Sequence, residues 1–529
     1  MTSFENDRVV PEIPFVGLHA HSVAGSIFDA LGYPQEHMDF AYQNGMDALA
    51  LTDHGNANGL AHQVLHAKKM LAEGKDFKPI FGVEAYFIPS VANWREEYEE
   101  HRANTKRLKK EVQSGTTIED SESKNKVKSF LKQRQHLILL AQNPTGLKNI
   151  FKMISASYTG DNFYRYPRID YAMLKRHNEG VIASSACLGG VYAGNYWDNK
   201  EEGKDAILDA MRDTTQKMQA VFGDRWYGEL QWIKSPDQHE LNQSIIQMHY
   251  EFGIPLISTA DSHYPSKDAW KDRELYKRLG WLGKGSPSWL SMDLPVDVDE
   301  VGYELYPKNG DEMWESYKRY SQMAGFEYDD ELILNSIKET YQIAHHRIER
   351  FTPDNTVRLP DFVVPEGLTA TDALAKLCME GARVLGFAEN QEYVDRLDRE
   401  IEVIDGRGFS KYFLTMKAIA DRATKKQIVG AGRGSAAGAL VSYALGITQV
   451  DPIKYGLQFE RFLTKGGAGY PDIDYDVSSP MELKEELIEE WGDDTVVPIT
   501  NWNTLQLRSL IKDISKFYEV PFKIGRAHV

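Results

Sequence analysis

The sequence predicts an α/β domain with a largely parallel sheet, followed by a mainly helical region. Between residue 15 and about residue 275, short apolar runs alternate with helical patterns. Such alternation is typical of a parallel sheet, either open or closed into a barrel. From about residue 281 to 420 the pattern becomes mainly helical. The apolar runs expected to form strands include Ala48–Leu51, Ile80–Val83, Leu137–Leu140, Val181–Ala183 and Ile254–Ser258.

Two further stretches interrupt this rhythm. The stretch from about residue 90 to 133 is dense in mixed charge, which favours an exposed, mostly helical insertion. Later, the turn-rich segment Gly430–Gly438 leads into an apolar helix and then into the acidic PDIDYD. We therefore expect the chemistry of the second half to lie around this turn and these acids.

Composition limits the class of protein. With 529 residues, 42% hydrophobic and 26% charged, the chain predicts a globular protein of two to four folding units. No stretch reaches the roughly 20 apolar residues of a membrane span, and the first residues lack a basic leader and an apolar core. Only Cys187 and Cys378 are present, which excludes a disulfide framework. These features predict a cytoplasmic protein with no membrane partner.

The net charge of −17 is unfavourable for a protein that binds nucleic acid, because phosphate binding relies on clustered Lys and Arg. Whole-chain charge describes solubility and the long-range field, however, and a local basic groove is sufficient for binding. The motifs therefore decide the function class.

Histidines and acids gather at the ends of the apolar runs. The clusters are HAH at 19–21, TDH at 52–54, Glu84, His136 and DSH at 261–263. In an HxH pair on a strand, both imidazoles point to the same side. Imidazoles with carboxylate oxygens suit Zn, Mn or Fe, which can activate water for attack on a phosphoester. One HxH can be coincidence, and the helical pair His62 and His66 fits an exposed face, but the recurrence favours a metal site.

The second constellation is GAGRGSAAGALVSYALGIT followed by GYPDIDYDV. Glycines allow the backbone to approach a phosphate, and Arg433 can make a fork-shaped contact with it. Asp472 and Asp474 would share one face of a strand and hold Mg²⁺, and Asp476 would extend that face. Taken singly, the glycine segment is also compatible with tight helix packing, and the acids with a solvated turn.

The histidine clusters, in this order, resemble the PHP (polymerase and histidinol phosphatase) domain that opens C-family DNA polymerase alpha subunits. The resemblance implies a distorted (β/α)7 barrel with Zn²⁺ or Mn²⁺. In some members of the family this domain is a 3′–5′ exonuclease, and in others it is structural. Asp53 would support the site, and Cys187 could instead be a small buried thiol. Asp29 stands one residue further from the HxH than in the family. The implied metal ligands are His19, His21, Asp29, His54, Glu84, His136, Cys187, Asp261 and His263.

The segment from YFLTMKAIADRATKK through GRGS to PDIDYD resembles the palm of the bacterial DNA polymerase III alpha subunit. The resemblance implies an α+β nucleotidyltransferase palm, then the start of a helical thumb. Asp472 and Asp474 would be two of three catalytic aspartates and bind Mg²⁺. Arg433, Gly434, Ser435 and Arg461 would bind the nucleotide. Implied substrates are primer-template DNA and deoxynucleoside triphosphates, and implied partners are a sliding clamp and other replisome subunits.

The resemblance also divides the chain. We expect a PHP domain over 1–280 with an insertion at about 90–133, the first part of the palm over 281–500, the start of the thumb over 501–523 and a non-native tail over 524–529. A third aspartate and the fingers do not follow, so negligible primer extension is expected of this chain alone. Two alternatives stay open, a stand-alone PHP phosphoesterase and a non-catalytic remnant or scaffold. The source is open between a bacterium and a phage.

Overall fold

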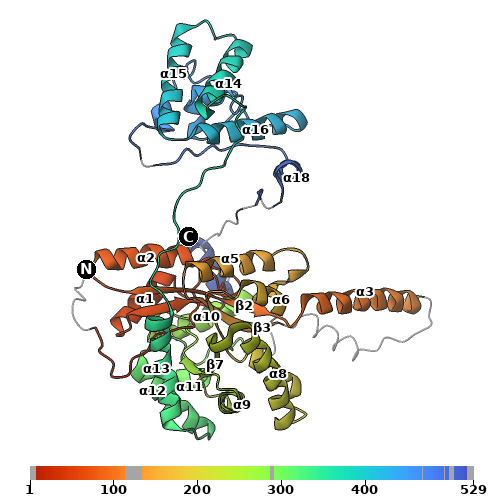
Figure 1. The fold of residues 1–529 in the computed structure, drawn as a ribbon, viewed down its shortest axis with the longest axis vertical. Coiled ribbons are helices and arrows are strands. Elements are labelled where there is room, and N and C mark those ends of the chain that lie inside the picture. Colours follow the sequence, from red (N-terminus) through yellow and green to blue (C-terminus); the bar gives the residue numbers. More distant parts are fainter. Residues whose placement is uncertain are drawn as a thin grey trace. The chain divides into compact units, whose positions relative to one another are not determined.

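The computed structural model describes residues 8–113, 134–285, 291–467, 469–493, 495–497, 499 and 506–520. The chain divides into two compact units, one of residues 1–354 with 505–529 and one of residues 355–504 (Figure 1). The first unit thus continues beyond residue 280, where the sequence analysis places the end of the first domain. The expected tail at 524–529 lies outside the described residues.

The first unit is built on an eight-stranded sheet in the order β4-β5-β2-β3-β6-β7-β8, with β1 paired to β2. All pairings around this sheet are parallel except those of β3, which is antiparallel to β2 and β6, and that of β4 with β5. The strands are β1 (Ala48–Leu51), β2 (Lys78–Phe87), β3 (Gln135–Ala141), β4 (Phe163–Tyr164), β5 (Tyr166–Ile169), β6 (Val181–Ser184), β7 (Trp226–Gln231) and β8 (Leu256–Thr259).

The chain near residues 17–20 closes this curled sheet. Gly17 forms a parallel bridge with Leu49 of β1, and Ala20 forms one with Ser262, just after β8. This segment therefore contacts the first strand and the end of the last strand. The result confirms the predicted distorted barrel, whose irregularity is the reversed β3.

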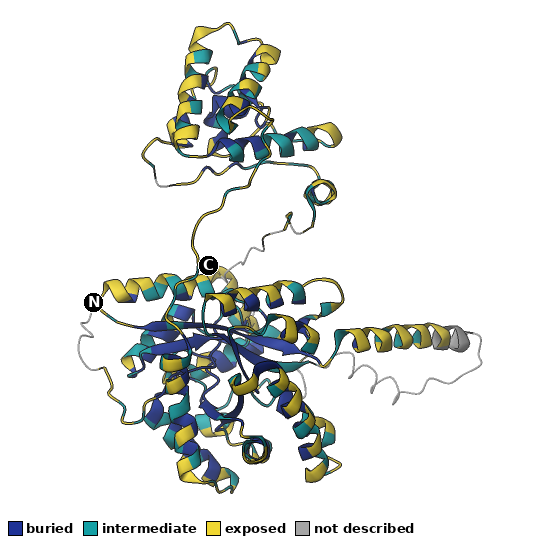
Figure 2. Ribbon diagram, viewed as in Figure 1, coloured by how far each residue is buried: buried dark blue, intermediate teal, exposed yellow. Residues whose placement is uncertain are grey.

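Both faces of the strands are buried, as expected for a barrel wrapped in helices. Leu137 and Leu139 of β3 join the large core beneath the helices, whereas Ile138 and Leu140 join a smaller core inside the barrel. His136 lies two residues before Ile138 on the same strand, so its side chain also points to the inner side of the barrel. Glu84 pairs directly with Ile138. One end of the interior is thus apolar, and the other is lined by ionisable side chains. Figure 2 shows the strands of this sheet as buried.

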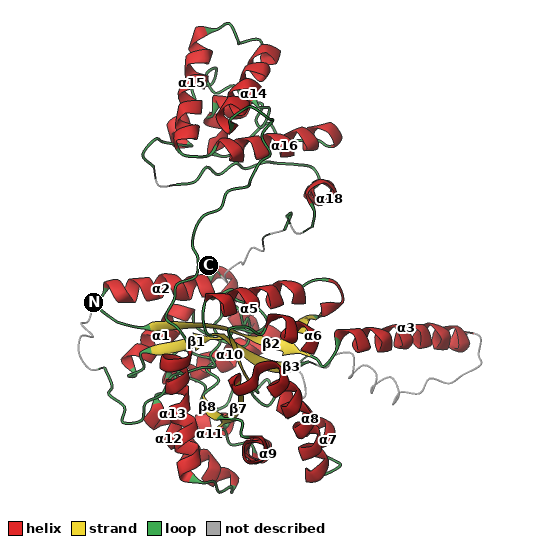
Figure 3. Ribbon diagram, viewed as in Figure 1, coloured by secondary structure: helices red, strands yellow, loops and turns green. Residues whose placement is uncertain are grey.

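Helices surround this sheet (Figure 3). Several begin at side-chain caps, for example where Asn143 accepts a hydrogen bond from the Gly146 N–H. No helix in the described part of the chain is both long and apolar enough to cross a membrane. The helices of this unit are α1 (Pro34–Gln43), α2 (Leu60–Ala72), α3 (Val91–Gln113), α5 (Pro144–Ser157), α6 (Tyr171–His177), α7 (Val191–Asn199), α8 (Lys204–Phe222), α9 (Pro236–Phe252), α10 (Trp270–Trp281), α11 (Val298–Val301), α12 (Gly310–Ala324), α13 (Asp330–Gln342) and α19 (Leu507–Phe517).

The helix α3 occupies the first half of the predicted insertion. It joins β2 to the segment before β3, and where its burial is described it is mostly exposed, with Trp94 as a buried anchor at its start (Figure 2). The remainder of the predicted insertion, residues 114–133, lies outside the described residues.

The second unit is helical in its described residues, with its own core that includes Leu374, Phe413 and Leu440. Its only β-type pairing there is the isolated antiparallel bridge between Val429 and Val477. Its elements are α14 (Ala370–Leu385), α15 (Gln391–Gly406), α16 (Ser410–Lys426), the 3₁₀ turns η5 (Ser435–Gly438) and η6 (Phe459–Arg461), α17 (Leu440–Ala444) and α18 (Pro480–Trp491).

Replacing Gly381 with Ala is expected to destabilise the second unit. A Cβ at this position of α14 would lie 1.8 Å from the backbone oxygen of Ala444 in α17, so the helices must separate. Overpacking of this kind costs about 1–3 kcal/mol. Hydrogen exchange by mass spectrometry should show faster exchange across α14 and α17. Gly406→Ala is the matched control, because its Cβ meets no atom within 4 Å. Equal exchange in both variants would contradict the predicted clash.

Candidate functional site

The structure brings together every side chain of the predicted first metal site, at one end of the barrel interior. These side chains come from several segments that are far apart in the chain and meet at that end. His19 and His21 lie in the closing segment, His54 follows β1, Glu84 and His136 lie in the paired strands β2 and β3, Cys187 follows β6, and Asp261 and His263 follow β8, with Asp29 in the turn after His21.

His19, His21 and Asp261 converge on one point. The Nε2 atoms of the two histidines are 3.0 Å apart, and Asp261 Oδ1 lies 3.0 Å from the first and 3.3 Å from the second. Two ligands of one tetrahedral zinc ion, with Zn–N bonds of about 2.0–2.1 Å, lie about 3.3 Å apart. The spacing of these atoms therefore matches that of atoms sharing a metal ion.

Glu84 is the centre of the arrangement. Its Oε1 lies 3.0 Å from His136 Nδ1 and 3.5 Å from His19 Nε2, while its Oε2 pairs with His54 Nδ1. Cys187 Sγ lies 3.6 Å from His136 Nδ1. One buried carboxylate thus stands between the HxH pair and the residues of β3 and of the loop after β6.

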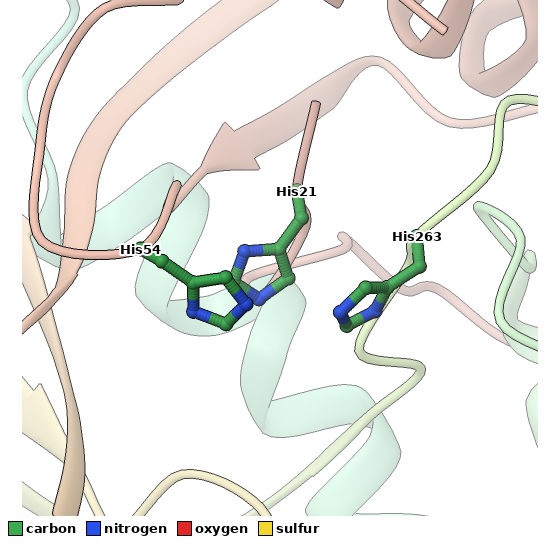
Figure 4. A group of neighbouring side chains, drawn as sticks. All are labelled: His21, His54 and His263. Carbon is green, nitrogen blue, oxygen red and sulfur yellow. The ribbon is translucent and has the colours of Figure 1, made fainter. Parts of the chain in front are cut away.

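A third group forms at the opening of the site. His21, His54 and His263 point toward one another, with ring centroids of His21 and His54 4.2 Å apart (Figure 4). Asp29 Oδ2 lies 3.2 Å from His54 Nε2 and 3.7 Å from His263 Nε2. Asp29 is therefore within the cluster despite its extra residue of spacing, and the preceding Phe28 adopts a left-handed φ of 61° in this turn.

Three sets of side chains have ligand atoms close enough for one ion each: His21 with His54 and His263, His19 with His21 and Glu84, and His54 with Glu84 and His136. They share members, as in a multinuclear site. Three of the buried atoms form no hydrogen bond of regular geometry. His54 Nδ1 and Glu84 Oε2 form an ion-pair contact with each other, and Asp261 Oδ1 lies 3.0 Å from His19 Nε2. Buried ligand atoms that crowd together in this way fit metal ions.

The electrostatics keep the carboxylates ionised. Burial alone would raise the pKa of Glu84, but His136 and His54 lower it well below its usual range. Burial together with His54 and His263 lowers the pKa of His21 to about 3, so its ring stays neutral at pH 7. Burial, with Glu84 and Asp261, raises the pKa of the Cys187 thiol well above its usual value, so coordination by Cys187 would release a proton.

Two strained residues border the cluster. Ala186, which precedes Cys187, has a φ of 59°, and Asp261 has a φ of 49°. Non-glycine residues seldom adopt left-handed backbone, and such strain concentrates at functional sites. Here it turns the chain inward immediately after β6 and β8.

Several supporting residues lie around the cluster. The predicted supporting role of Asp53 has a structural counterpart, since its Oδ1 accepts hydrogen bonds from the Ser22 N–H at 2.6 Å and from the Ser26 hydroxyl at 2.9 Å. The buried Glu229 was not predicted from the sequence, and it accepts a hydrogen bond from His19 Nδ1 at 2.7 Å. An acid inside an otherwise apolar strand, WYGELQ, was the available signal.

Arg273 was missed as well. Its guanidinium is buried and donates to the Asp29 side chain at 2.7 Å and to the Asp29 backbone oxygen at 2.7 Å. It also donates to Glu274 at 3.1 Å. Arg273 thus fixes the loop that carries Asp29, and nothing in its local sequence marks it, because it lies on a charged helix far along the chain.

In the second unit, the glycine loop and the acidic segment lie against each other. Arg433 Nη1 donates to Asp476 Oδ1 at 3.1 Å, and its Nε lies 3.9 Å from Asp474 Oδ2. Gly434 has a φ of 66°, and a Cβ there would lie 2.4 Å from Asp474 Oδ2. Only glycine allows this contact.

The local structure around these residues differs from the prediction in two ways. Residues 471–476 form no strand. The positive φ angles at Gly432 and Gly434 turn the glycine loop, and its β-type pairing with the acidic segment is limited to the Val429–Val477 bridge in the described residues. Ser435 begins a 3₁₀ turn of four residues, and the predicted apolar helix begins only at Leu440.

The other residues predicted for the site in the second unit do not form a compact cluster of ligands. Asp472 is exposed and Asp474 is half-buried on either side of the buried Ile473. Arg461 is exposed at the end of η6, and no ion pair of Arg461 occurs within the described residues. In the same part of the chain, no three-ligand group includes Asp472 or Asp474.

The chain is similar to known protein families in two separate regions. Residues 17–232 match the PHP domain, and residues 372–528 match the bacterial DNA polymerase III alpha NTPase domain. The chain is 32% identical over 526 residues to the DNA polymerase III subunit alpha of Aquifex aeolicus, covering 96% of this chain and 40% of that protein. It is 32% identical over 515 residues to that of Borreliella burgdorferi, covering 96% of this chain and 39% of that protein. The chain thus spans about two fifths of the length of these curated relatives.

Proposed function

Because the chain belongs to the DNA polymerase III alpha family, we propose that its first unit is a metal-dependent phosphodiesterase, acting as a 3′–5′ exonuclease on DNA within a replicative polymerase. The observation that carries this proposal is the convergence of three overlapping sets of buried ligand atoms at one end of the barrel. A merely structural barrel end would not need imidazoles and carboxylates crowded together without regular hydrogen bonds.

The donor set suits Zn²⁺ or Mn²⁺, since imidazole nitrogens outnumber carboxylates. Bound ions would polarise the phosphoryl oxygen and supply a nucleophilic hydroxide near neutral pH. The chain's own residues orient the ligands. Glu229 accepts the Nδ1–H of His19, which leaves the Nε2 lone pair directed at the centre. Arg273 holds Asp29 at the opening.

Metal removal tests the proposal directly. Purified chain is expected to contain transition metal by elemental analysis and to shorten a single-stranded oligonucleotide from its 3′ end. Treatment with EDTA should abolish this hydrolysis, and Zn²⁺ or Mn²⁺ should restore it. The proposal would be contradicted if the wild-type chain contained no bound metal and if His54→Ala and Asp261→Ala hydrolysed the oligonucleotide as wild type does.

We further propose that the full-length protein is a cytoplasmic DNA-directed DNA polymerase. The observation that favours this second function is the packing of Gly434 and Arg433 against Asp474. Carboxylates of Asp472 and Asp474 suit Mg²⁺, and Arg433 can contact a triphosphate once released from the acids. The substrates would be primer-template DNA and deoxynucleoside triphosphates, with a sliding clamp and replisome subunits as partners. Templated primer extension by the full-length protein with Mg²⁺ tests this, and its absence would contradict it.

A further inference from the structure

One arginine, Arg134, lies beside the first metal site. It immediately precedes β3, two residues before His136, and both side chains contact the ring of Tyr86. Its guanidinium carbon lies 3.7 Å from the ring centroid of Tyr166 and 5.4 Å from that of Tyr86. Arg134 makes no ion pair with any residue that the structure describes, and its Nε is buried without a hydrogen-bond partner.

The two tyrosines connect this arginine to the candidate metal ligands. Tyr86 pairs directly with His136 across β2 and β3, and their rings meet edge to face with centroids 5.5 Å apart. The Tyr86 ring is also nearly parallel to that of His54, at 16° and 6.1 Å. Tyr166 packs against Tyr86 at 5.0 Å. The rings therefore form a continuous wall from the ligands to Arg134.

We infer that Arg134, held on the rings of Tyr166 and Tyr86, binds a backbone phosphate of a single-stranded nucleic acid whose neighbouring phosphodiester lies at the metal cluster. This inference rests on the proposed hydrolytic function and specifies its substrate class, a single-stranded nucleic acid. An aromatic wall orients the planar guanidinium, whose N–H donors match phosphate oxygens. The cluster contains the carboxylates of Asp29, Glu84 and Asp261, so a cation at its edge would help to attract the negatively charged strand.

The test compares two phosphodiesters. One is a single-stranded oligonucleotide, and the other is bis(p-nitrophenyl) phosphate, which has no neighbouring phosphate. Arg134→Gln is expected to raise the KM for the oligonucleotide about tenfold, the effect of one lost charged contact. Hydrolysis of bis(p-nitrophenyl) phosphate and metal content should not change. Arg134→Lys should restore only part of the affinity, because it keeps the charge but loses the planar donor group that stacks on the tyrosine rings. Arg176→Gln, which removes an exposed arginine of α6, should behave as wild type.

Binding distinguishes failure of the subsite from failure of the hydrolytic function. The affinity of the full chain for the oligonucleotide, measured by fluorescence anisotropy at several salt concentrations, should depend less steeply on salt in Arg134→Gln, by about 0.7 in the logarithmic slope. Hydrolysis of neither substrate by wild type would overturn the hydrolytic function alone. Equal salt slopes, or an equal loss on both substrates, would overturn the subsite.

Discussion

Replacing Glu84 with Gln should lower 3′-end hydrolysis by the first unit at least about 100-fold, and should reduce the number of metal ions bound per chain. Glu84 is fully buried, belongs to two of the three ligand sets and lies between His54 and His136. Its pKa is held well below the usual range by these histidines, so wild type presents a charged carboxylate throughout the neutral pH range. The amide keeps the size but removes the charge and one acceptor oxygen.

Elemental analysis and hydrolysis rates, measured on the same preparations, check this expectation. Glu73→Gln is the control, because Glu73 is an exposed glutamate that pairs with Lys75 on the surface. Circular dichroism should be the same for both variants. Full activity of Glu84→Gln with wild-type metal content would remove the carboxylate from the proposed mechanism.

Replacing Asp474 with Asn in the full-length protein should lower primer extension by about 100- to 1000-fold while 3′-end hydrolysis continues unchanged. Asp474 is the acid that packs on Gly434 and lies near Arg433, so its charge faces the predicted nucleotide loop. Hydrolysis depends on side chains of the other compact unit, so the two activities should respond separately.

Single-nucleotide incorporation on a primed template measures the first activity. Asp395→Asn, which changes an exposed acid of α15 in the same unit, should extend primers at the wild-type rate. If Asp474→Asn retains incorporation, or if the control variant loses it equally, the assignment of Asp474 to the palm chemistry fails.

The sequence predicted the barrel and the membership of the first cluster well, for a physical reason. Most of the predicted residues belong to short motifs at the start or end of an apolar run, and barrel strands bring their ends together. Asp29 and Cys187 were predicted through the resemblance to the PHP domain. Even Asp29, one residue out of place, reaches His54, because Phe28 absorbs the extra residue in a left-handed conformation.

What the sequence did not predict is the support around these ligands. Glu229, Arg273 and Arg134 act through contacts with residues far away in the chain, and a single polar residue has no periodicity to reveal it. The expected strand at Asp472 failed for a related reason. Alternation of exposed and buried residues is present there, but a ladder also needs a straight partner, and the glycines at 432 and 434 bend that partner away.

The reversed direction of β3 has a consequence for how this barrel can diversify. The antiparallel strands β2 and β3 are connected at the end where Phe87 pairs with Gln135, which lies beside His136. Any chain added between them enters and leaves at the mouth of the metal site. This connection can therefore change in length or be replaced during evolution without any change in the order of the barrel strands. A probe or a second domain can be attached there by engineering for the same reason.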